Sequence, residues 1–519
     1  MMIKQLQRLQ LAAIAAVFCG GAAFYTAGLL AGGSSFAGAL AGGVSNSLCM
    51  FFANHNVDLV ETAPWFSPPL ALLFWLIHIA AVFLTAYSLL QIVAKQFTIN
   101  LRILFGRYGK IYILQDATPE NVLLARNIAT DDGKVQADKQ SLVVITDPDA
   151  GEDCRSQVAS FGGYLCREAK TNPLLEAKMK KREVVEIKPV HAEELAARQA
   201  IAEHPPYECL AFDAGKANRG LHALVLGFAE LGQEMALQLI RNSQFVGGRP
   251  RITVIDRRAD SLKPQFKFHY PCLDMCCDIE FHNCDVTDAE YYKLLDGLQP
   301  DYVAAALGTA EKDKAALADI TTSFLRRDLP LPVAISMSAY AEIDRIYTKA
   351  LVVNEALDRM AMAVNGVYSN AADSAESKAR WDKLDEFSKQ SSRASADFIA
   401  AHLHIAGVSL EEAIECGKDA KPLPVSEELT EVLAETEHLR WNAFHFCAGF
   451  RPETVDKLLP QRKDLERRLH ICLVPYAELD DLSQDYNSRA GAKRNFKNND
   501  RAIIQNLPQF LSQTHGNSI

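Results

Sequence analysis

Two long runs without a charged residue constrain this chain most. Residues 11–30 and 70–94 contain no Asp, Glu, Lys or Arg. Each run is close to the length of about 20 apolar residues that crosses a bilayer as an α-helix. The sequence therefore predicts two transmembrane helices, at about 11–30 and 70–94, within an anchor formed by residues 1–104.

A cleaved signal peptide is the alternative for the first run, because Lys4 and Arg8 precede it and small residues follow it. The apolar part of a signal peptide is only about 7–15 residues long, and no second span is expected after it. We therefore favour a membrane helix.

Lys and Arg lie before the first run and after the second, whereas the segment 31–69 between the runs contains neither. The flanking cations are Lys4 and Arg8 before the first run, and Lys95, Arg102, Arg107 and Lys110 after the second. Because Lys and Arg concentrate in cytoplasmic flanks, we expect a multi-pass protein of a bacterial-type inner membrane with both termini in the cytoplasm.

The segment between the runs does not contain the Thr-Val-Gly-Tyr-Gly type of sequence that forms a potassium selectivity filter. Residues 41–52 are a candidate re-entrant or interfacial helix. His78, inside the second run, is expected to make a packed polar contact between helices rather than to serve a proton path.

A βαβ pattern begins at residue 221. The apolar run 222–226 ends at Gly227, Gly232 lies in the opening of a helix, and the run 251–255 ends at Asp256. In a nucleotide-binding unit of this kind, the glycines allow a tight turn and close helix packing, the helix N-terminus faces phosphate, and the acid accepts ribose hydroxyls. Ala229 replaces the middle glycine, and its methyl group crowds the approach of a pyrophosphate.

Further strands are predicted at 278–288, 301–308 and 330–336, separated by segments of helix length. This alternation indicates a parallel sheet with its ligand crevice at the carboxyl ends of the strands. The candidate cofactor-binding residues on this rim are Gly227, Ala229, Gly232, Asp256, Asp285 and Gly308, and the candidate ligands are NAD(H), ATP or ADP, or an ADP-ribose-type nucleotide. The alternative is that the acids only end strands and cap helices.

A similar but degenerate pattern precedes this one. Strands are predicted at 110–114 and 141–147 and a helix at 119–129, but the turn 115–119 has no glycine. We therefore interpret residues 105–205 as a second Rossmann-like lobe without a nucleotide, whose role is to pair with the lobe at 219–340.

Composition excludes some classes of function. At about 100–200 residues per domain, 519 residues suggest three or four units. The net charge of −10 gives no basic field for nucleic acid. The 12 cysteines include no CxxC pair, so we interpret them as reduced thiols rather than disulfides or a metal site.

Two membrane helices followed by tandem Rossmann-like lobes resemble the regulators of potassium conductance, the RCK or TrkA-N family. Gly227, Gly232 and Asp256 match the family's glycine-rich turn and strand-end acid. The resemblance covers about 300 residues and implies that the domains assemble as dimers or larger rings, sense nucleotides or ions, and act on a membrane partner. It does not extend to a potassium filter.

Residues 341–425 are predicted to be a helical linker, with a loop at 369–377. The last segment, 426–519, resembles the RyR domain, the repeat module of ryanodine receptors. The resemblance rests on Glu437, His438, Trp441 and Asn442, on Gly449-Phe450, on the Leu-Val-Pro-Tyr stretch with Glu478-Leu479, and on Asp500-Arg501. It implies a mostly α-helical domain of about 95 residues, with Gly-Phe in place of the family's frequent Gly-Trp.

Five neighbouring polar and aromatic residues make a candidate ligand pocket on the first helix of this segment: Glu437, His438, Arg440, Trp441 and Asn442. In one interpretation a base stacks on Trp441 while Arg440 and Asn442 bind phosphate or sugar. The favoured alternative is a buried polar network that holds helices together, with Trp441 in the core. Without another His or Cys at ligand spacing, Glu437-His438 predicts neither a metal site nor a catalytic centre.

The sequence as a whole predicts an α/β protein that is not an enzyme: a homo-oligomeric membrane protein, dimer or tetramer, in which a small nucleotide-derived ligand regulates ion flow or membrane disruption. One alternative is a membrane-tethered NAD-dependent oxidoreductase, although no Ser/Tyr/Lys or His/Asp arrangement follows the glycine pattern. The other is a scaffold that binds no ligand.

Overall fold

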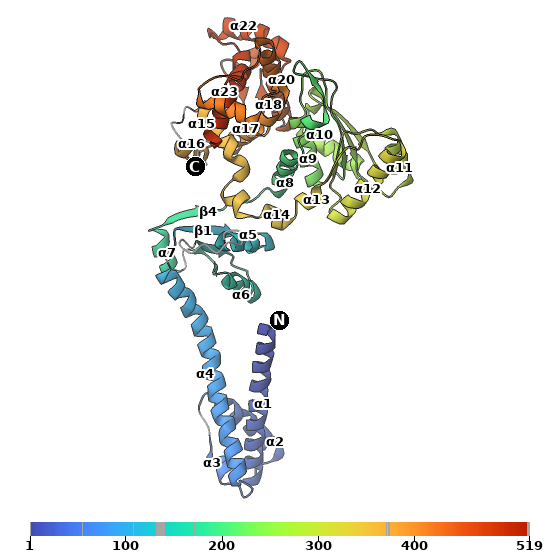
Figure 1. The fold of residues 1–519 in the computed structure, drawn as a ribbon. Coiled ribbons are helices and arrows are strands. Elements are labelled where there is room, and N and C mark those ends of the chain that lie inside the picture. The colour runs from blue at the N-terminus through green and yellow to red at the C-terminus, as the bar shows by residue number, and fades with distance from the viewer. Residues whose placement is uncertain are drawn as a thin grey trace. The chain divides into compact units, whose positions relative to one another are not determined.

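The computed structural model describes residues 2–53, 56–106, 108–130, 141–169, 172–369, 371 and 374–515. Arg107 lies outside the described residues, and so do the side chains of Lys4, Arg8, Lys95 and Arg102. The chain forms two compact units, one from Met1–Ile111, Asp138–Leu142 and Cys166–Val184, and one from Tyr112–Ala137, Val143–Leu165 and Val185–Ile519. Helices and parallel strands together make it a mixed α/β protein (Figure 1).

The N-terminal part of the first unit is helical. Its elements are α1 (Met2–Ala31), α2 (Phe36–Met50), α3 (Asp58–Glu61) and α4 (Pro68–Phe105). Stretches of α1 and α4, at Ala12–Ala31 and Pro68–Ser88, are long and apolar enough to cross a membrane. They coincide with the two predicted spans, although both helices extend beyond them.

Helix α2 packs closely on α1. It begins at residue 36, where the Ser35 hydroxyl accepts a hydrogen bond from the Gly38 N–H, so it starts earlier than the predicted segment 41–52. A methyl group on Gly43 would overlap Thr26 Oγ1 and lie 2.9 Å from Ala22 O. Small residues of this kind allow two helix backbones to approach closely, as they do in membrane proteins.

His78 makes the predicted polar contact between helices. Its Nδ1 lies 3.0 Å from Phe74 O and its Nε2 lies 2.9 Å from Tyr25 Oη. Because a carbonyl only accepts, Nδ1 carries the hydrogen of a neutral ring and Nε2 accepts from the tyrosine. The pair joins α4 to α1.

The next segment contains a four-stranded sheet with the order β3-β2-β1-β4. Its strands and helices are β1 (Lys110–Gln115), α5 (Pro119–Thr130), β2 (Leu142–Thr146), α6 (Glu152–Ser160), β3 (Tyr164–Cys166), α7 (Pro173–Met179) and β4 (Glu183–Glu186). Asp116 has a φ of +61° in the turn that lacks glycine. Asp147, after β2, accepts a hydrogen bond from the Ala117 N–H at 2.9 Å and so ties this turn to the next strand.

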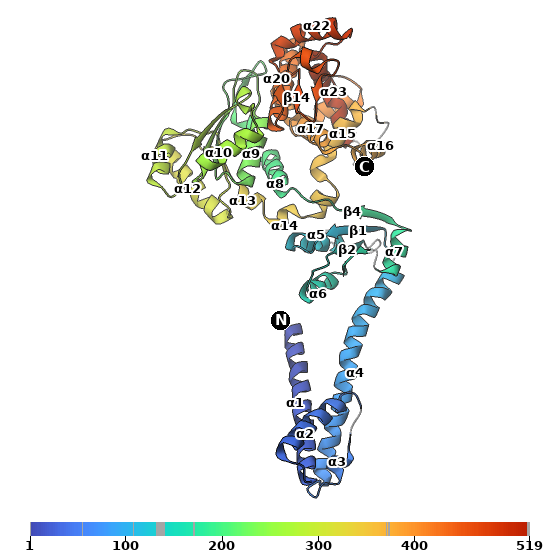
Figure 2. The ribbon, with the colours of Figure 1, turned by 180° about the vertical axis from the view of Figure 1, so that it is seen from behind.

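A five-stranded sheet follows the helix α8 (Ala192–Glu203). Its strands are β7 (His222–Leu226), β8 (Arg251–Ile255), β9 (Asp278–His282), β10 (Tyr302–Ala305) and β11 (Val333–Ser336). The order is β11-β10-β7-β8-β9, and every adjacent pair is parallel. The green to yellow part of the ribbon in Figure 2 contains this sheet. All five predicted strands are present, the last three shorter than predicted.

Helices cover both faces of this sheet because its strands alternate between two hydrophobic cores. Ala223 and Val225 pack in the core that contains α9 (Glu230–Asn242) and Phe266 of α10 (Ala259–His269). Leu224 and Leu226 pack in the core that contains residues of α11 (Ala289–Gly297) and α12 (Ala310–Arg326). Strands buried on both faces are expected in a parallel sheet.

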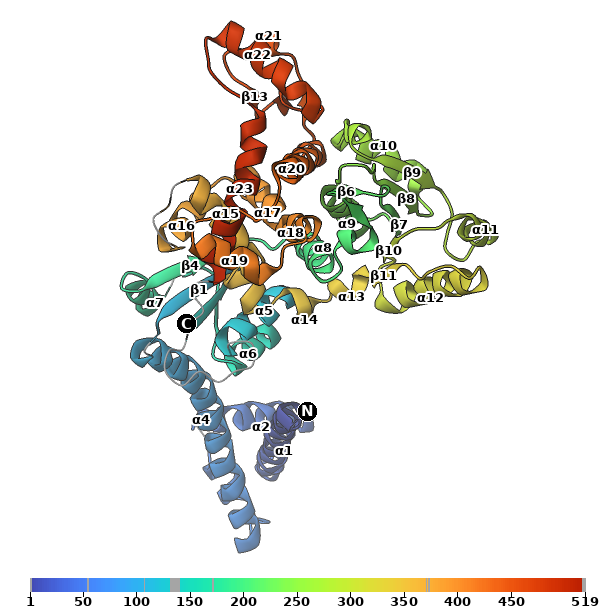
Figure 3. The same cartoon turned by 45° about the horizontal axis from the view of Figure 1, so that its top comes forward.

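The C-terminal half is mostly helical (Figure 3). Its helices are α13 (Met337–Tyr340), α14 (Ile343–Ile346), α15 (Arg359–Tyr368), α16 (Ser374–Trp381), α17 (Glu386–Asp397), α18 (Ile399–Ala406), α19 (Leu410–Lys418), α20 (Glu427–Cys447), α21 (Val455–Leu458), α22 (Leu479–Ala490) and α23 (Lys497–His515). Short strands β12 (Arg451–Pro452), β13 (Lys463–Asp464) and β14 (Leu469–His470) interrupt them.

Two features of this half differ from the sequence-based interpretation. The predicted loop 369–377 is wrong at its end, because α16 begins at Ser374. The segments 219–340, 341–425 and 426–519 also share one hydrophobic core, to which α9, α18 and α20 all contribute. Periodicity within a helix reveals which face is buried but not which distant helix covers it.

Candidate functional site

A cavity of about 810 Å³ lies among the C-terminal helices. Its volume is within the range of about 300–1,000 Å³ that is typical of small-molecule sites. Its walls come from α15, α17, α20, the segment 460–472, α22 and the start of α23. The lining residues on which we build are Ser391, Ser392, Ser395, His438, Arg440, Trp441, Arg462, Lys463, His470, Arg494 and Asp500.

Helix α20 carries all five residues of the predicted pocket. Its start is fixed by the Ser426 hydroxyl, which accepts a hydrogen bond from the Leu429 N–H at 3.1 Å, and by two acids in the first turn. Its end is followed by Gly449, whose φ is +77°. The 21-residue helix places His438, Arg440 and Trp441 at the cavity, but Glu437 and Asn442 do not line it.

Glu437 and Arg440 form a buried two-point ion pair. Arg440 Nε donates to Glu437 Oε2 and Arg440 Nη2 donates to Oε1, each at 2.7 Å. Glu437 is completely buried and Arg440 is only 2% exposed. Burial raises the pKa of Glu437, but the charge and hydrogen bonds of Arg440 and a contact with His402 at 3.2 Å outweigh it and hold this pKa at about 2.

One nitrogen of Arg440 is unused. Its Nη1 is buried and has no hydrogen-bond partner in the described part of the chain. Ser395 of α17, which also borders the cavity, is buried with an unpartnered hydroxyl in the same way. A buried donor without an acceptor costs about 1–3 kcal/mol. Both residues border the cavity, and each carries an unsatisfied polar atom.

His438 and Asp500 share one proton. His438 Nδ1 lies 3.1 Å from Asp500 Oδ2, and Nε2 lies 2.9 Å from Val474 O. Since the carbonyl only accepts, Nε2 carries a hydrogen, and one further proton lies between Nδ1 and the carboxyl. Burial raises the pKa of Asp500 against the opposing hydrogen bond from His438. The pair is neutral wherever this proton resides.

Trp441 lies among imidazole rings rather than in an open slot. His445 is 4.0 Å from it between ring centroids, His470 is at 4.9 Å, and His438 is at 5.8 Å and nearly parallel. His438 and His445 flank it one helical turn to either side on α20. Trp441 is half-buried and borders the cavity, so it contributes apolar surface there.

His470 is a neutral donor. Its Nδ1 accepts a hydrogen bond from the Cys472 N–H at 3.0 Å, which leaves the ring hydrogen on Nε2. Burial, together with the charges of Lys463, Arg462 and His438, lowers the pKa of His470 to about 3. The ring is therefore uncharged at physiological pH, mainly because it is buried.

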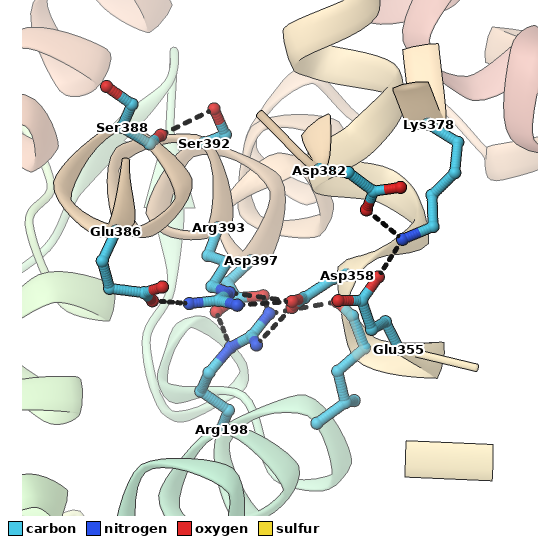
Figure 4. Close-up of polar contacts among 11 residues, drawn as sticks. Arg198, Glu355, Asp358, Lys378, Asp382, Glu386, Ser388, Ser392, Arg393 and Asp397 are labelled. Carbon is cyan, nitrogen blue, oxygen red and sulfur yellow. Dashed lines mark hydrogen bonds and ion pairs between the residues drawn. The ribbon is translucent and has the colours of Figure 1, made fainter. Parts of the chain in front are cut away.

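An ion-pair cluster fixes the helix that carries the cavity serines (Figure 4). Arg198 of α8 contacts Asp397 of α17 with Nε at 2.9 Å and Nη2 at 3.0 Å, and contacts Asp358 with Nη1 at 2.7 Å. Arg393 of α17 also contacts Asp358, at 2.8 Å. Ser392 lies on the other side of α17 from Arg393 and Asp397.

The predicted residues of the sheet lie together at one edge. Gly227, Asp256, Asp285 and Gly308 follow the carboxyl ends of β7, β8, β9 and β10, which are adjacent and in parallel register. Gly227 has a φ of +83°, and a methyl group on Gly232 would overlap Gly227 O. Ala229 caps α9 in an extended conformation.

The acids of this edge already bind the backbone. Asp256 accepts hydrogen bonds from the Phe228 N–H at 2.7 Å and the Arg258 N–H at 2.6 Å. Asp285 accepts from the N–H and the hydroxyl of Thr287, and these bonds lower its pKa. Asp256 and Asp285 thus have a structural role in the turns that follow the strands.

Several cavity residues were not among the predicted ones. Ser395, Arg462, Lys463, His470 and Arg494 come from segments that are remote from α20 in sequence. The nearest signal is the basic composition of 462–468 and 493–494, which by itself indicates only a solvated surface. Among the described residues, no group of three or more His, Cys, Asp and Glu is placed to hold a metal ion.

No protein-family model, curated protein or solved structure matches this chain.

Proposed function

We propose that this protein is a membrane-anchored sensor in which the cavity beside Arg440 binds a small nucleotide-derived ligand and thereby regulates a membrane-embedded assembly. The single observation that carries the proposal is the unpartnered Nη1 of Arg440 at a cavity of about 810 Å³. A cavity of this size with a few convergent polar groups is the usual form of a ligand site.

The chemistry of the cavity supports this ligand class. Arg440, Ser395 and His470 supply hydrogen-bond donors, Trp441 and Phe496 supply aromatic surface, and three cations border the opening. Nucleotides combine an aromatic ring, hydrogen-bond acceptors and negative charge. The candidate ligands are ATP or ADP, NAD(H) and ADP-ribose derivatives, and guanine nucleotides carry the same three features.

The membrane part of the proposal rests on two helices long and apolar enough to cross a bilayer. Two such helices do not enclose a pore, so the proposed assembly is a homo-oligomer, dimer or tetramer, in an inner membrane. Regulation of ion flow or of membrane integrity then requires a ligand that binds two states of the assembly with different affinity.

The order of strands β7 to β11 supports the proposed likeness of residues 219–340 to RCK or TrkA-N domains. The helical structure of residues 426–519 supports their proposed likeness to RyR domains. We place the ligand in the C-terminal cavity rather than at the sheet edge. Asp256 already accepts two backbone hydrogen bonds, and Ala229 stands where a pyrophosphate would approach.

The test is a thermal-shift screen of the detergent-solubilised full chain with NAD, NADH, ATP, ADP, GDP, GTP, ADP-ribose and cyclic nucleotides. The wild type and Asp256→Ala should both be stabilised by one of these ligands, whereas Ser395→Ala and Trp441→Ala should lose most of the shift. A shift that disappears only in Asp256→Ala would move the site to the sheet edge. No shift with any compound would favour the scaffold.

A further inference from the structure

The charged groups that border the cavity fall into two zones. At the inner wall, Arg440 is neutralised by Glu437, and His438 with Asp500 forms a neutral pair. Exposed or half-exposed cations, which we call the rim cations, border the opening: Arg462, Lys463 and Arg494. None of the rim cations forms an ion pair within the described residues.

The two zones suit different parts of a ligand. A phosphate placed at the inner wall would lose its hydration and would face an arginine whose charge is already balanced, so its desolvation would not be repaid. At the rim, the same phosphate keeps part of its hydration and faces three uncompensated positive charges. Polyanionic groups are therefore more stable at the rim than inside.

The inner wall instead suits an uncharged group that accepts hydrogen bonds. Arg440 Nη1 and His470 Nε2 are donors, and the Ser395 hydroxyl is unpartnered. The acid that borders this region, Asp500, is engaged by His438. The O6/N7 edge of guanine or hypoxanthine offers two acceptors to such donors, whereas on the same edge of adenine the amino group beside N7 would face another donor.

From this arrangement we propose that the ligand is a nucleoside di- or triphosphate with an oxo-substituted base, which enters base first and leaves its phosphates on the rim cations. The inference deepens the proposed function and rests on it. It reverses the simpler assignment, in which Arg440 binds phosphate. The rim cations then determine how the affinity depends on the number of phosphates, and Arg440 and Ser395 determine which base is bound.

The experiment measures the affinity of the full chain for GMP, GDP, GTP, ATP and inorganic phosphate by calorimetry at several KCl concentrations. The variants are the double substitution Lys463→Gln/Arg494→Gln at the rim, Ser395→Ala at the inner wall, and Lys493→Gln as a control. Lys493 is exposed and adjacent to Arg494 but does not line the cavity.

In the wild type, affinity should rise from GMP to GTP, and the gain should weaken with salt because exposed charges are screened. The double rim variant should reduce the gain from GMP to GTP by about three- to tenfold, the effect of two partly exposed ion pairs. Lys493→Gln should leave it unchanged. Ser395→Ala should weaken GMP and GTP by the same factor.

Two results would overturn the inference while leaving the proposed function intact. One is a gain from GMP to GTP that survives the double rim variant and disappears in Arg440→Lys, which would place the phosphates at the inner wall. The other is tighter binding of ATP than of GTP. Failure of these nucleotides and of every compound in the thermal-shift screen to bind would instead reject the proposed function itself.

Discussion

The carboxylate of Asp256 lies 2.7 Å from the backbone nitrogen of Phe228, across the turn between β7 and α9. Asp147 makes the same kind of bond to Ala117 in the preceding segment. In both places an aspartate that follows one strand accepts a hydrogen bond from the turn that follows the adjacent strand of the sheet. The two βα turns are thus built alike, although only one of them contains glycine.

Asp256→Ala should destabilise the protein in the absence of any ligand. The substitution removes the acceptor of the buried Phe228 N–H, and an unsatisfied buried donor costs about 1–3 kcal/mol. Thermal unfolding of the ligand-free protein checks this, with the exposed Asp274→Ala as the control. Equal melting temperatures for the two variants would contradict a structural role for Asp256.

Gly232→Ala should be more harmful than Gly297→Ala. An added methyl group at Gly232 would overlap the carbonyl oxygen of Gly227, so α9 would have to move away from β7, and overpacking of this kind typically costs about 1–3 kcal/mol. At Gly297 nothing lies within 4 Å of the added group. Denaturant midpoints for the two variants test the difference, and similar midpoints would refute close packing at Gly232.

Arg198→Met should destabilise the C-terminal half by up to about 3–5 kcal/mol, because it removes the partner of the partly buried Asp397 carboxylate and one of the two arginines that contact the buried Asp358 carboxylate. Arg155→Met, at an exposed position, should be neutral. Hydrogen exchange of α17 would locate the effect. Unchanged protection of α17 in the first variant would mean that the cluster does not hold this helix.

Glu437 should contribute to acid sensitivity. Its pKa falls from 4.5 to about 2 on folding, because Arg440 and His402 outweigh the effect of burial. A carboxyl with a depressed pKa stabilises the fold above its unfolded pKa, and this contribution is lost as the pH falls through the folded value. Between pH 5 and 3, the wild type should therefore lose more stability than Glu437→Gln.

Melting temperatures at pH 7, 5, 4 and 3 measure this difference. Glu435→Gln serves as the control, since Glu435 lies on the same helix and has no ion pair in the described part of the chain. Parallel pH profiles for the wild type and Glu437→Gln would show that the Glu437–Arg440 pair adds nothing to the fold.

Much of the architecture was predictable because local patterns determine it. The apolar runs locate α1 and α4, and the alternation of strands and helices after residue 221 gives all five parallel strands. Gly227 and Gly232 were correctly assigned to a tight turn and to close packing. The predicted loop at 369–377 was wrong at its end. The polar composition of the segment favoured a loop in the prediction, but residues 374–381 form a helix.

The site was predictable only in part. The sequence identified five neighbouring residues of α20, of which Glu437 and Asn442 are buried structural residues, whereas His438, Arg440 and Trp441 also border a cavity. That these residues bind a ligand stays a prediction. Ser395 and the rim cations could not be predicted, because their place depends on how α17 and the segment 460–472 pack against α20. That packing involves contacts between residues far apart in the chain.

The bonds from Arg198 to Asp358 and Asp397 have a consequence for the speed at which the proposed ligand would enter the cavity. They hold α17 on the side away from its cavity serines, so this wall is already in place before a ligand arrives. No slow rearrangement of α17 then precedes or follows the encounter. The observed association rate should accordingly rise in proportion to ligand concentration without reaching a plateau, as expected for a preformed site.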